Sequence, residues 1–227
     1  MDDLAIELEG VWKIFGDQPA QIVEDIRREG LSKAEVLEKF NAVVGIADVS
    51  FQVNAGEIFC IMGLSGSGKS TLVRHINRLI EPTAGKITLL GQQILDLSEN
   101  QLREIRAKKV GMVFQHMALF PHRSVRDNVA YPLEIRNEPK LRRWDVSQRM
   151  LSMVGLDGFE DRFPTELSGG MQQRVGLARA LASDPDVLLM DEPFSALDPL
   201  IRRQLQDQFL DLSAQLNKTT LFITHDL

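Results

Sequence analysis

The amino-acid sequence predicts an α/β fold with a mixed, mainly parallel sheet and an inserted helical subdomain. Strand-like apolar runs alternate with segments of helical spacing along the 227 residues, a pattern typical of parallel strands covered by helices. The stretch from about 116 to 180 is mostly helical in pattern, so we expect it to form the subdomain. The composition, 44% hydrophobic and 26% charged residues, fits a soluble globular protein.

Each element follows from a local signal. Period-two or continuous apolar runs bounded by turn residues predict strands at 4–15, 46–53, 57–63, 86–90, 110–115, 186–190 and 219–224. Helical spacing predicts helices at 69–80, 98–108, within 124–182, and at 199–216. Between the first two strands, residues 18–42 show helical spacing, and Ser32 with Glu35 forms a capping-box pattern. We therefore expect a small helical insertion at about 18–42.

A glycine-rich turn, IMGLSGSGKST, follows the apolar run that ends at Met62. Gly63, Gly68, Lys69 and Ser70 fit the pattern G-x-x-x-x-G-K-[ST] between a strand and a helix. Glycines let backbone N–H groups face an anion, and the helix N-terminus adds partial positive charge. We expect the turn to hold a nucleoside triphosphate in a P-loop NTPase (RecA-like) core, through Gly63, Leu64, Ser65, Gly66, Ser67, Gly68, Lys69, Ser70 and Thr71.

The stretch DVLLMDEP places two carboxylates, Asp191 and Glu192, at the end of an apolar strand. Ligands of parallel sheets bind at the carboxyl ends of the strands. Asp191 is expected to hold Mg²⁺, and Glu192 to orient or deprotonate the attacking water. Taken alone, such a pair after a strand is more often a solvated turn; the phosphate-binding turn favours the catalytic interpretation.

A third motif, LSGGMQQR, opens a helix. Ser168 can cap that helix while Gly169 and Gly170 expose backbone N–H groups, which would make a second anion site. The alternative is an ordinary helix cap.

The order of these motifs, together with the FQ that contains Gln115, SALD at 195–198 and ITHD at 223–226, resembles the nucleotide-binding subunits of ATP-binding cassette (ABC) transporters. The resemblance implies that two subunits pack head to tail. Each ATP is then enclosed by the phosphate turn of one subunit and by Ser168, Gly169 and Gly170 of the other.

The resemblance also implies roles for single residues. Lys69, Ser70 and Thr71 serve the phosphates and the metal; Gln115 senses Mg²⁺ and water and contacts the membrane subunit; His225 contacts the γ-phosphate; Asp198 lies in the segment that crosses the dimer interface; and Phe15 stacks on adenine, with Trp12 as a rival. Judged alone, His225 would be an ordinary histidine at a strand end.

The chain resembles the ATPases of glycine betaine and proline betaine importers in its helical insertion and in the sequences INRLIEPTAGKITL and SALDPLIR. The ATPases of choline and carnitine importers are nearly as similar. The partners implied are a second copy of the chain, a transmembrane permease and, indirectly, a substrate-binding protein. The expected location is the cytoplasmic face of the membrane. Met117, Leu119 and Phe120 occupy the segment that would contact the permease, although core packing explains any one of them as well.

Three further expectations concern Cys60, the net charge and the carboxyl terminus. Cys60 lies in an apolar strand, so a buried structural thiol is expected rather than a reactive one. A formal net charge of -6 argues against a nucleic-acid surface, and thus against a soluble ABC ATPase acting on ribosomes or DNA. The resemblance also implies that the catalytic domain continues beyond Leu227, often into CBS modules, so we expect an incomplete carboxyl terminus.

Overall fold

The computed structural model describes residues 4–195 and 197–224. Its residues group into two compact units, Met1–Ala55 with Met62–Glu99 and Gly56–Ile61 with Asn100–Leu227. Each unit is built around a sheet of four strands. The predicted α/β class is confirmed, but the strands are divided between two sheets.

The first unit contains an antiparallel sheet. Its strands follow the order β2-β1-β4-β5, with bounds Val43–Asn54, Leu4–Phe15, Ala84–Leu89 and Gln92–Gln93. The expectation of mainly parallel pairing therefore fails for this half of the chain. The helical segment between β1 and β2 returns the chain to the end of the strand that it left, and such a hairpin connection makes antiparallel neighbours.

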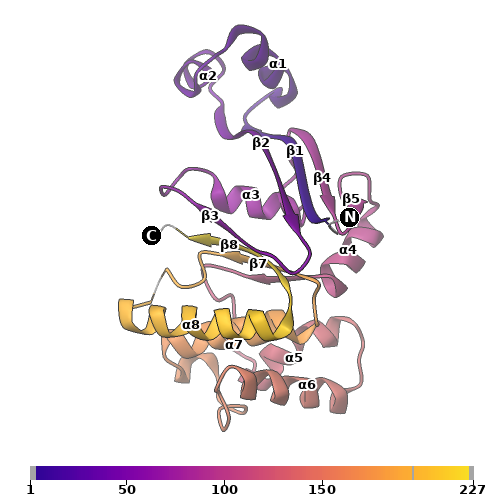
Figure 1. Cartoon of the computed structure of the whole chain (residues 1–227), viewed down its shortest axis with the longest axis vertical. Helices are drawn as coiled ribbons and strands as arrows, with labels where there is room; N and C mark the ends of the chain where they lie inside the picture. Colours follow the sequence, from indigo (N-terminus) through magenta and orange to yellow (C-terminus); the bar gives the residue numbers. More distant parts are fainter. Residues whose placement is uncertain (1–3, 196, 225–227) are drawn as a thin grey trace. The chain divides into compact units, whose positions relative to one another are not determined.

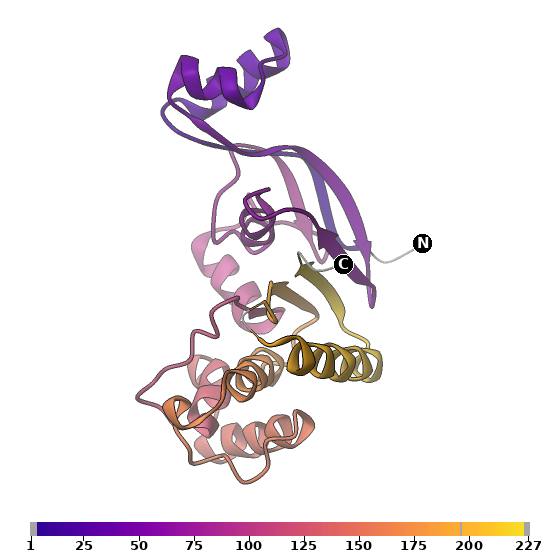
Figure 2. The same cartoon turned by 90° about the vertical axis from the view of Figure 1, so that its left-hand side faces the viewer.

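The predicted pair of helices stands at the end of the β1–β2 hairpin, as Figures 1 and 2 show. They are α1, Pro19–Glu29, and α2, Lys33–Phe40. The predicted capping box is confirmed: Ser32 Oγ accepts from Glu35 N at 3.3 Å, and Ser32 N donates to Glu35 Oε2 at 2.8 Å. The helices and the strands bury a small core of their own, made of Trp12, Ile14, Ile22, Val23, Val36, Ala42 and Val44.

The helix after the glycine-rich turn, α3, spans Lys69–Ile76 and ends four residues before the predicted end at Ile80. Two polar contacts stop it. Asn77 Oδ1 accepts from Leu79 N at 3.3 Å, and His75 Nδ1 lies 2.6 Å from Ile80 O. Arg78 has a φ of 53°, which a right-handed helix excludes.

The second unit contains the sheet β3-β8-β7-β6, with bounds Ile58–Met62, Thr219–Thr224, Val187–Asp191 and Val110–Val113. Strands β6, β7 and β8 pair in parallel, as the sequence predicts. All five residues of β7 are buried. This central strand delivers Asp191 and Glu192 to its carboxyl end.

Strand β3 is less buried than the sequence predicts. Ile58 is 42% and Met62 48% exposed, and Cys60 between them is exposed as well. The expectation of a buried Cys60 is therefore wrong. Among the described strands β3 has β8 as its single neighbour, and side chains two apart on an edge strand share one face. An apolar run identifies a strand but does not say whether another layer covers it.

The helices of the second unit are α4, Glu99–Lys108; α5, Val125–Ile135; α6, Lys140–Met153; α7, Gly169–Ala182; and α8, Pro199–Leu216, with a 3₁₀ turn at Pro164–Glu166. Helices α5, α6 and α7 lie side by side (Figure 1) and share one apolar core with β7 and α8. They belong to the same compact unit as the parallel sheet, so a separate subdomain at about 116–180 stays a prediction. None of the helices in the described part of the chain has both the length and the apolar character needed to cross a bilayer.

Candidate functional site

The glycine-rich turn in the first unit closes around the ammonium group of Lys69. Lys69 is only 7% exposed, and its Nζ donates to Gly63 O at 2.7 Å and to Leu64 O at 2.8 Å. Ser67 N donates to Leu64 O at 3.2 Å, which makes a tight turn at the tip. The cation is thus held at the centre of the loop, where it can meet an anionic ligand.

Backbone geometry explains why this loop contains glycines. Gly66 has a φ of 78° and Gly68 a φ of 95°, values that L residues with a Cβ rarely adopt. A Cβ on Gly68 would also lie 2.3 Å from Gly45 O on β2. At this position glycine is required by both conformation and space.

Helix α3 begins at the end of this loop. In the described structure no side chain caps α3, whose N-cap residue is Gly68. The first turn contains Lys69, Ser70 and Thr71, none of them acidic. Its N–H groups and the positive end of the helix dipole are therefore suited to an anion supplied by a ligand.

A second group of predicted residues meets at the carboxyl end of β7 in the second unit. Asp191 has no exposed surface, and Glu192 follows it with a φ of 46°. Gln115 Nε2 donates to Glu192 Oε2 at 3.4 Å and to Ser195 Oγ at 3.5 Å. The structure thus brings Gln115 and Glu192 together, 77 residues apart in sequence.

Ser195, which the motifs mark only as part of SALD, contacts both Glu192 and Gln115. Its Oγ donates to Glu192 O at 3.0 Å, and its N–H donates to the same carbonyl at 3.2 Å. Ser195 therefore holds the turn that carries Glu192 while its hydroxyl accepts from Gln115. A serine three residues after the carboxylate was the only local signal for this contact.

The LSGGMQQR motif caps α7 as predicted. Ser168 Oγ accepts from Met171 N at 3.3 Å, while Ser168 and Gly169 are exposed and Gly170 is partly exposed. A Cβ on Gly169 would lie 3.7 Å from Leu197 Cδ2, so the SALD segment passes beside the motif. Asp198 is exposed, and its carbonyl accepts from Arg202 N at 2.9 Å.

Arg179, which the sequence analysis did not single out, joins α7 to the segment after Gln115. Its guanidinium donates to Met117 O at 2.8 Å and to Ala118 O at 2.7 Å. Burial lowers the pKa of Arg179 from its ordinary value. An arginine on a helix carries no local signal for a contact with residues 61 and 62 positions away.

The remaining predicted residues differ in how they are placed. Trp12 is 6% exposed and its Nε1 donates to Asp48 Oδ1 at 3.3 Å, so its ring faces are not available to a ligand. Phe15 is 44% exposed, with Lys13 Nζ 5.1 Å from its ring centroid. Of the two aromatic candidates, Phe15 is the accessible one. His225 lies outside the described residues.

Comparison with known proteins gives the same assignment as the motifs. The family model for the ABC transporter matches residues 46–195. The chain is 55% identical over 224 residues to the glycine betaine transport ATP-binding protein OpuAA of Bacillus subtilis, covering 99% of this chain and 53% of the relative. It is 52% identical to the trimethylamine N-oxide transport system ATP-binding protein TmoW of Ruegeria pomeroyi, covering 100% of this chain and 66% of that relative.

Among solved structures, the dimeric post-hydrolysis state of the ATP-binding cassette MJ0796 bound to ADP and Pi is similar, with a TM-score of 0.79 and 31% identity over 97% of this chain and 88% of that one. The chain spans about half the length of the glycine betaine relative. The family model covers well over half of this chain, and its matched range contains the phosphate loop, Gln115, the LSGGMQQR motif and both carboxylates. The chain therefore belongs to the ABC transporter family.

Proposed function

We propose that this chain is the ATP-binding and ATP-hydrolysing subunit of an importer for glycine betaine, proline betaine or a related osmoprotectant. One observation carries the hydrolytic part of this proposal. Glu192 is held in a left-handed turn, beside Gln115 and directly after the buried Asp191. Binding alone needs no such carboxylate, whereas hydrolysis needs a group that takes a proton from water.

The roles follow from the chemistry of each side chain. Lys69 and the first-turn N–H groups of α3 bind the phosphates. Glu192 accepts the proton of the attacking water, and Gln115 orients that carboxylate through its amide. We assign adenine stacking to Phe15 and contact with the γ-phosphate to His225.

The side chains that we expect to hold a metal fit Mg²⁺ by their chemistry. The Ser70 hydroxyl, the Asp191 carboxylate and the Gln115 amide are oxygen donors, which hard cations prefer. When bound, Mg²⁺ neutralises charge on the phosphates.

We further propose that two copies form the complete site. Ser168 and Gly169 are exposed at the cap of α7, so the N–H groups there can reach a phosphate held by another copy. Asp198, also exposed, would line the interface between the copies. The similar MJ0796 cassette is described as dimeric with ADP and Pi, which supports this arrangement.

A permease partner and a location at the cytoplasmic face of the membrane belong to the same proposal. The segment that contains Met117, Leu119 and Phe120 is our candidate for the contact with the permease. Leu119 packs on the apolar core, and the Phe120 ring lies edge-on to the Tyr131 ring with centroids 4.6 Å apart. Because changes at these two residues would also disturb packing, Met117 is the better position for a test. If Met117→Glu left assembly with the permease and transport coupling intact, the assignment of this surface would be wrong.

The substrate class rests on the relatives. One relative is named for glycine betaine transport and another for trimethylamine N-oxide transport. Both compounds carry a fully substituted nitrogen. Choline or carnitine import remains the alternative within this class. A soluble ABC ATPase without a transport role is the alternative outside it, and salt-sensitive binding to RNA or DNA would favour it.

The test is Mg²⁺-ATP hydrolysis as a function of protein concentration, with Glu192→Gln as the matched variant. A rate that rises faster than linearly, and that the variant loses while it still binds ATP, supports a composite catalytic site. Lys69→Ala should instead weaken ATP binding itself. Hydrolysis by Glu192→Gln at the unmodified rate would remove Glu192 from the catalytic role.

A further inference from the structure

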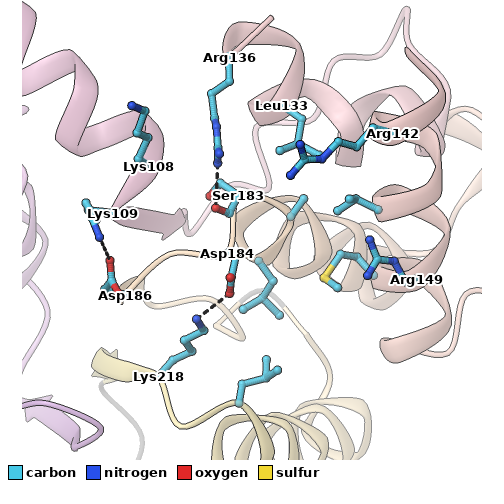
Figure 3. Close-up of a pocket in the computed structure, with 15 residues that line it drawn as sticks. Lys108, Lys109, Leu133, Arg136, Arg142, Arg149, Ser183, Asp184, Asp186 and Lys218 are labelled. Atoms are coloured by element: carbon cyan, nitrogen blue, oxygen red, sulfur yellow. Dashed lines mark hydrogen bonds and ion pairs between the residues drawn. The ribbon is translucent and has the colours of Figure 1, made fainter. Parts of the chain in front are cut away.

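The second unit contains a cavity of about 680 Å³, which Figure 3 shows with the residues that line it. It lies beside the amino ends of β7 and β8, next to Asp186 and Lys218. Asp191 and Glu192 stand at the other end of β7, on the order of 15 Å along the strand. A molecule in this cavity would therefore be separate from Asp191 and Glu192 within the second unit.

The wall of the cavity is rich in cations. Six of its side chains are basic and two are acidic, although the whole chain has a formal net charge of -6. Figure 3 shows them around one opening. They come from the carboxyl ends of α4 and α5, from α6, and from the loops that lead into β7 and β8. The basic residues are Lys108, Lys109, Arg136, Arg142, Arg149 and Lys218, and the acidic ones are Asp184 and Asp186. Each of the six also has a carboxylate partner, in Glu104, Glu138, Asp145, Asp184 or Asp186, so an anionic ligand would bind by competing with these pairs.

The cations at the rim have acidic partners that an anion can replace. Arg149 pairs with Asp145 at 3.1 Å, and the two side chains are 63% and 69% exposed. Lys109 pairs with Asp186 at 2.9 Å, with both side chains about half exposed. Such exposed pairs contribute about 0–1 kcal/mol each. A ligand with several charges would gain more from the same cations than these single carboxylates do.

The floor of the cavity is apolar. Helix α6 presents Arg142, Val146, Arg149 and Met150 to the cavity. Their spacings of four, seven and eight residues from Arg142 place them on one face of the helix, with Val146 and Met150 as its apolar members. The other apolar side chains come from α5, α7 and the end of α8 and are Leu133, Leu181, Ala182 and Leu216. A basic rim around an apolar floor suits a molecule with both an apolar body and several negative charges.

Arg136 ties the wall to the end of α7. Its Nη1 donates to Ser183 O at 3.1 Å, and Ser183 caps the C-terminus of that helix. The orientation of this guanidinium is therefore fixed before any ligand arrives, which lowers the entropic cost of binding.

We propose that this cavity binds an organic polyanion of roughly nucleotide size, with two or more phosphate or carboxylate groups on an apolar or planar body. The volume falls within the range of about 300–1,000 Å³ typical of small-molecule sites. The residues that carry the proposal are Arg142 and Arg149 at the rim and Met150 and Leu216 at the floor. It does not depend on ATP hydrolysis by the candidate site.

The test uses pyrenetetrasulfonate, a planar fluorescent polyanion, titrated against the full chain in the presence of excess Mg²⁺-ATP. The double variant Arg142→Gln/Arg149→Gln should bind it about tenfold or more weakly, because charge-assisted contacts are lost. Lys140→Gln is the matched control: it removes a cation from the same helix that contacts the Trp144 ring at 4.3 Å instead of lining the cavity. Circular dichroism melts check that all variants are folded.

Binding that persists with ATP present, weakens in the double variant and stays within about twofold in Lys140→Gln would support the site. Absence of binding to the unmodified chain would overturn the proposal. An equal loss in both variants would overturn it as well, because it would show binding to general surface charge. Displacement of the probe by ATP would place it at the phosphate loop and have the same consequence.

Discussion

Replacing Gly68 with alanine tests the assigned geometry of the phosphate loop most directly. The new Cβ would lie 2.3 Å from Gly45 O and 3.0 Å from Ile46 Cδ1, at a φ of 95°. The oxygen belongs to the backbone of β2, so the loop or the strand must move by roughly 1 Å to restore ordinary contact distances. Gly66→Ala is the matched control, because its φ is 78° but no described atom lies within 4 Å of its Cβ position.

The two variants share the conformational cost and differ in the steric cost. Left-handed backbone costs a residue with a Cβ about 1–2 kcal/mol, partly offset by about 0.4–1 kcal/mol from the stiffer unfolded chain. Overpacking adds about 1–3 kcal/mol at Gly68 alone. We expect a loss of unfolding free energy of about 1 kcal/mol for Gly66→Ala and about 3 kcal/mol for Gly68→Ala.

Thermal unfolding followed by circular dichroism measures this difference. For a chain of this size, 1 kcal/mol corresponds to about 2–4 °C in Tm, so we expect a fall of about 3 °C for Gly66→Ala and about 10 °C for Gly68→Ala. Equal falls in Tm for the two variants would refute the reasoning, because the contact with Gly45 O would then have no energetic effect.

Three other predictions follow from the same structure. Glu192→Gln should lower the rate of ATP hydrolysis by about 10²–10⁴-fold and leave binding of a fluorescent ATP analogue within a few-fold, since only the proton acceptor is lost; a comparable loss of binding would contradict this. Arg179→Met should cost about 2–3 kcal/mol in urea unfolding and speed amide hydrogen exchange at 115–119, because two carbonyls lose a charged donor; unchanged exchange there would argue against the contact. Burial lowers the pKa of His75 in the folded chain, so the unfolded chain binds a proton at this imidazole more readily. The free energy of unfolding should therefore fall as pH drops below about 6.5, by up to about 1.4 kcal/mol per pH unit. His75→Asn, measured by urea unfolding at about pH 7.5 and about pH 5.5, should lose less stability over this interval than the unmodified chain, and an identical loss in both would exclude His75 as the cause.

Features set by neighbouring residues in the sequence were predictable. The capping box of Ser32 and Glu35 and the cap of α7 by Ser168 each depend on residues within three positions. The predicted bounds of α8 and the predicted start of β8 at Thr219 match the structure, because the apolar periodicity of each segment is clear. The glycines of the phosphate loop were predictable for the same reason.

Features set by distant residues were not. The antiparallel sheet depends on which strands become neighbours, and the exposure of Cys60 depends on whether another layer covers β3. Helix α3 ends early because of the side chains of His75 and Asn77, which its apolar spacing does not reveal. The contact of Gln115 with Glu192 could be expected only from the resemblance to a family, since no pattern in the sequence links residues 77 positions apart.

The β1–β2 hairpin has a practical consequence for engineering. Phe15 pairs with Val43, so the two ends of the segment that forms α1 and α2 are adjacent, and the segment packs its own small core against the strands. Gly30, between the helices, has no described atom within 4 Å of its Cβ position. A circularly permuted fluorescent protein spliced in after Gly30 would enter at an exposed tip, where insertions are best tolerated. The tip of this hairpin is thus a suitable insertion site for building a genetically encoded reporter of nucleotide binding.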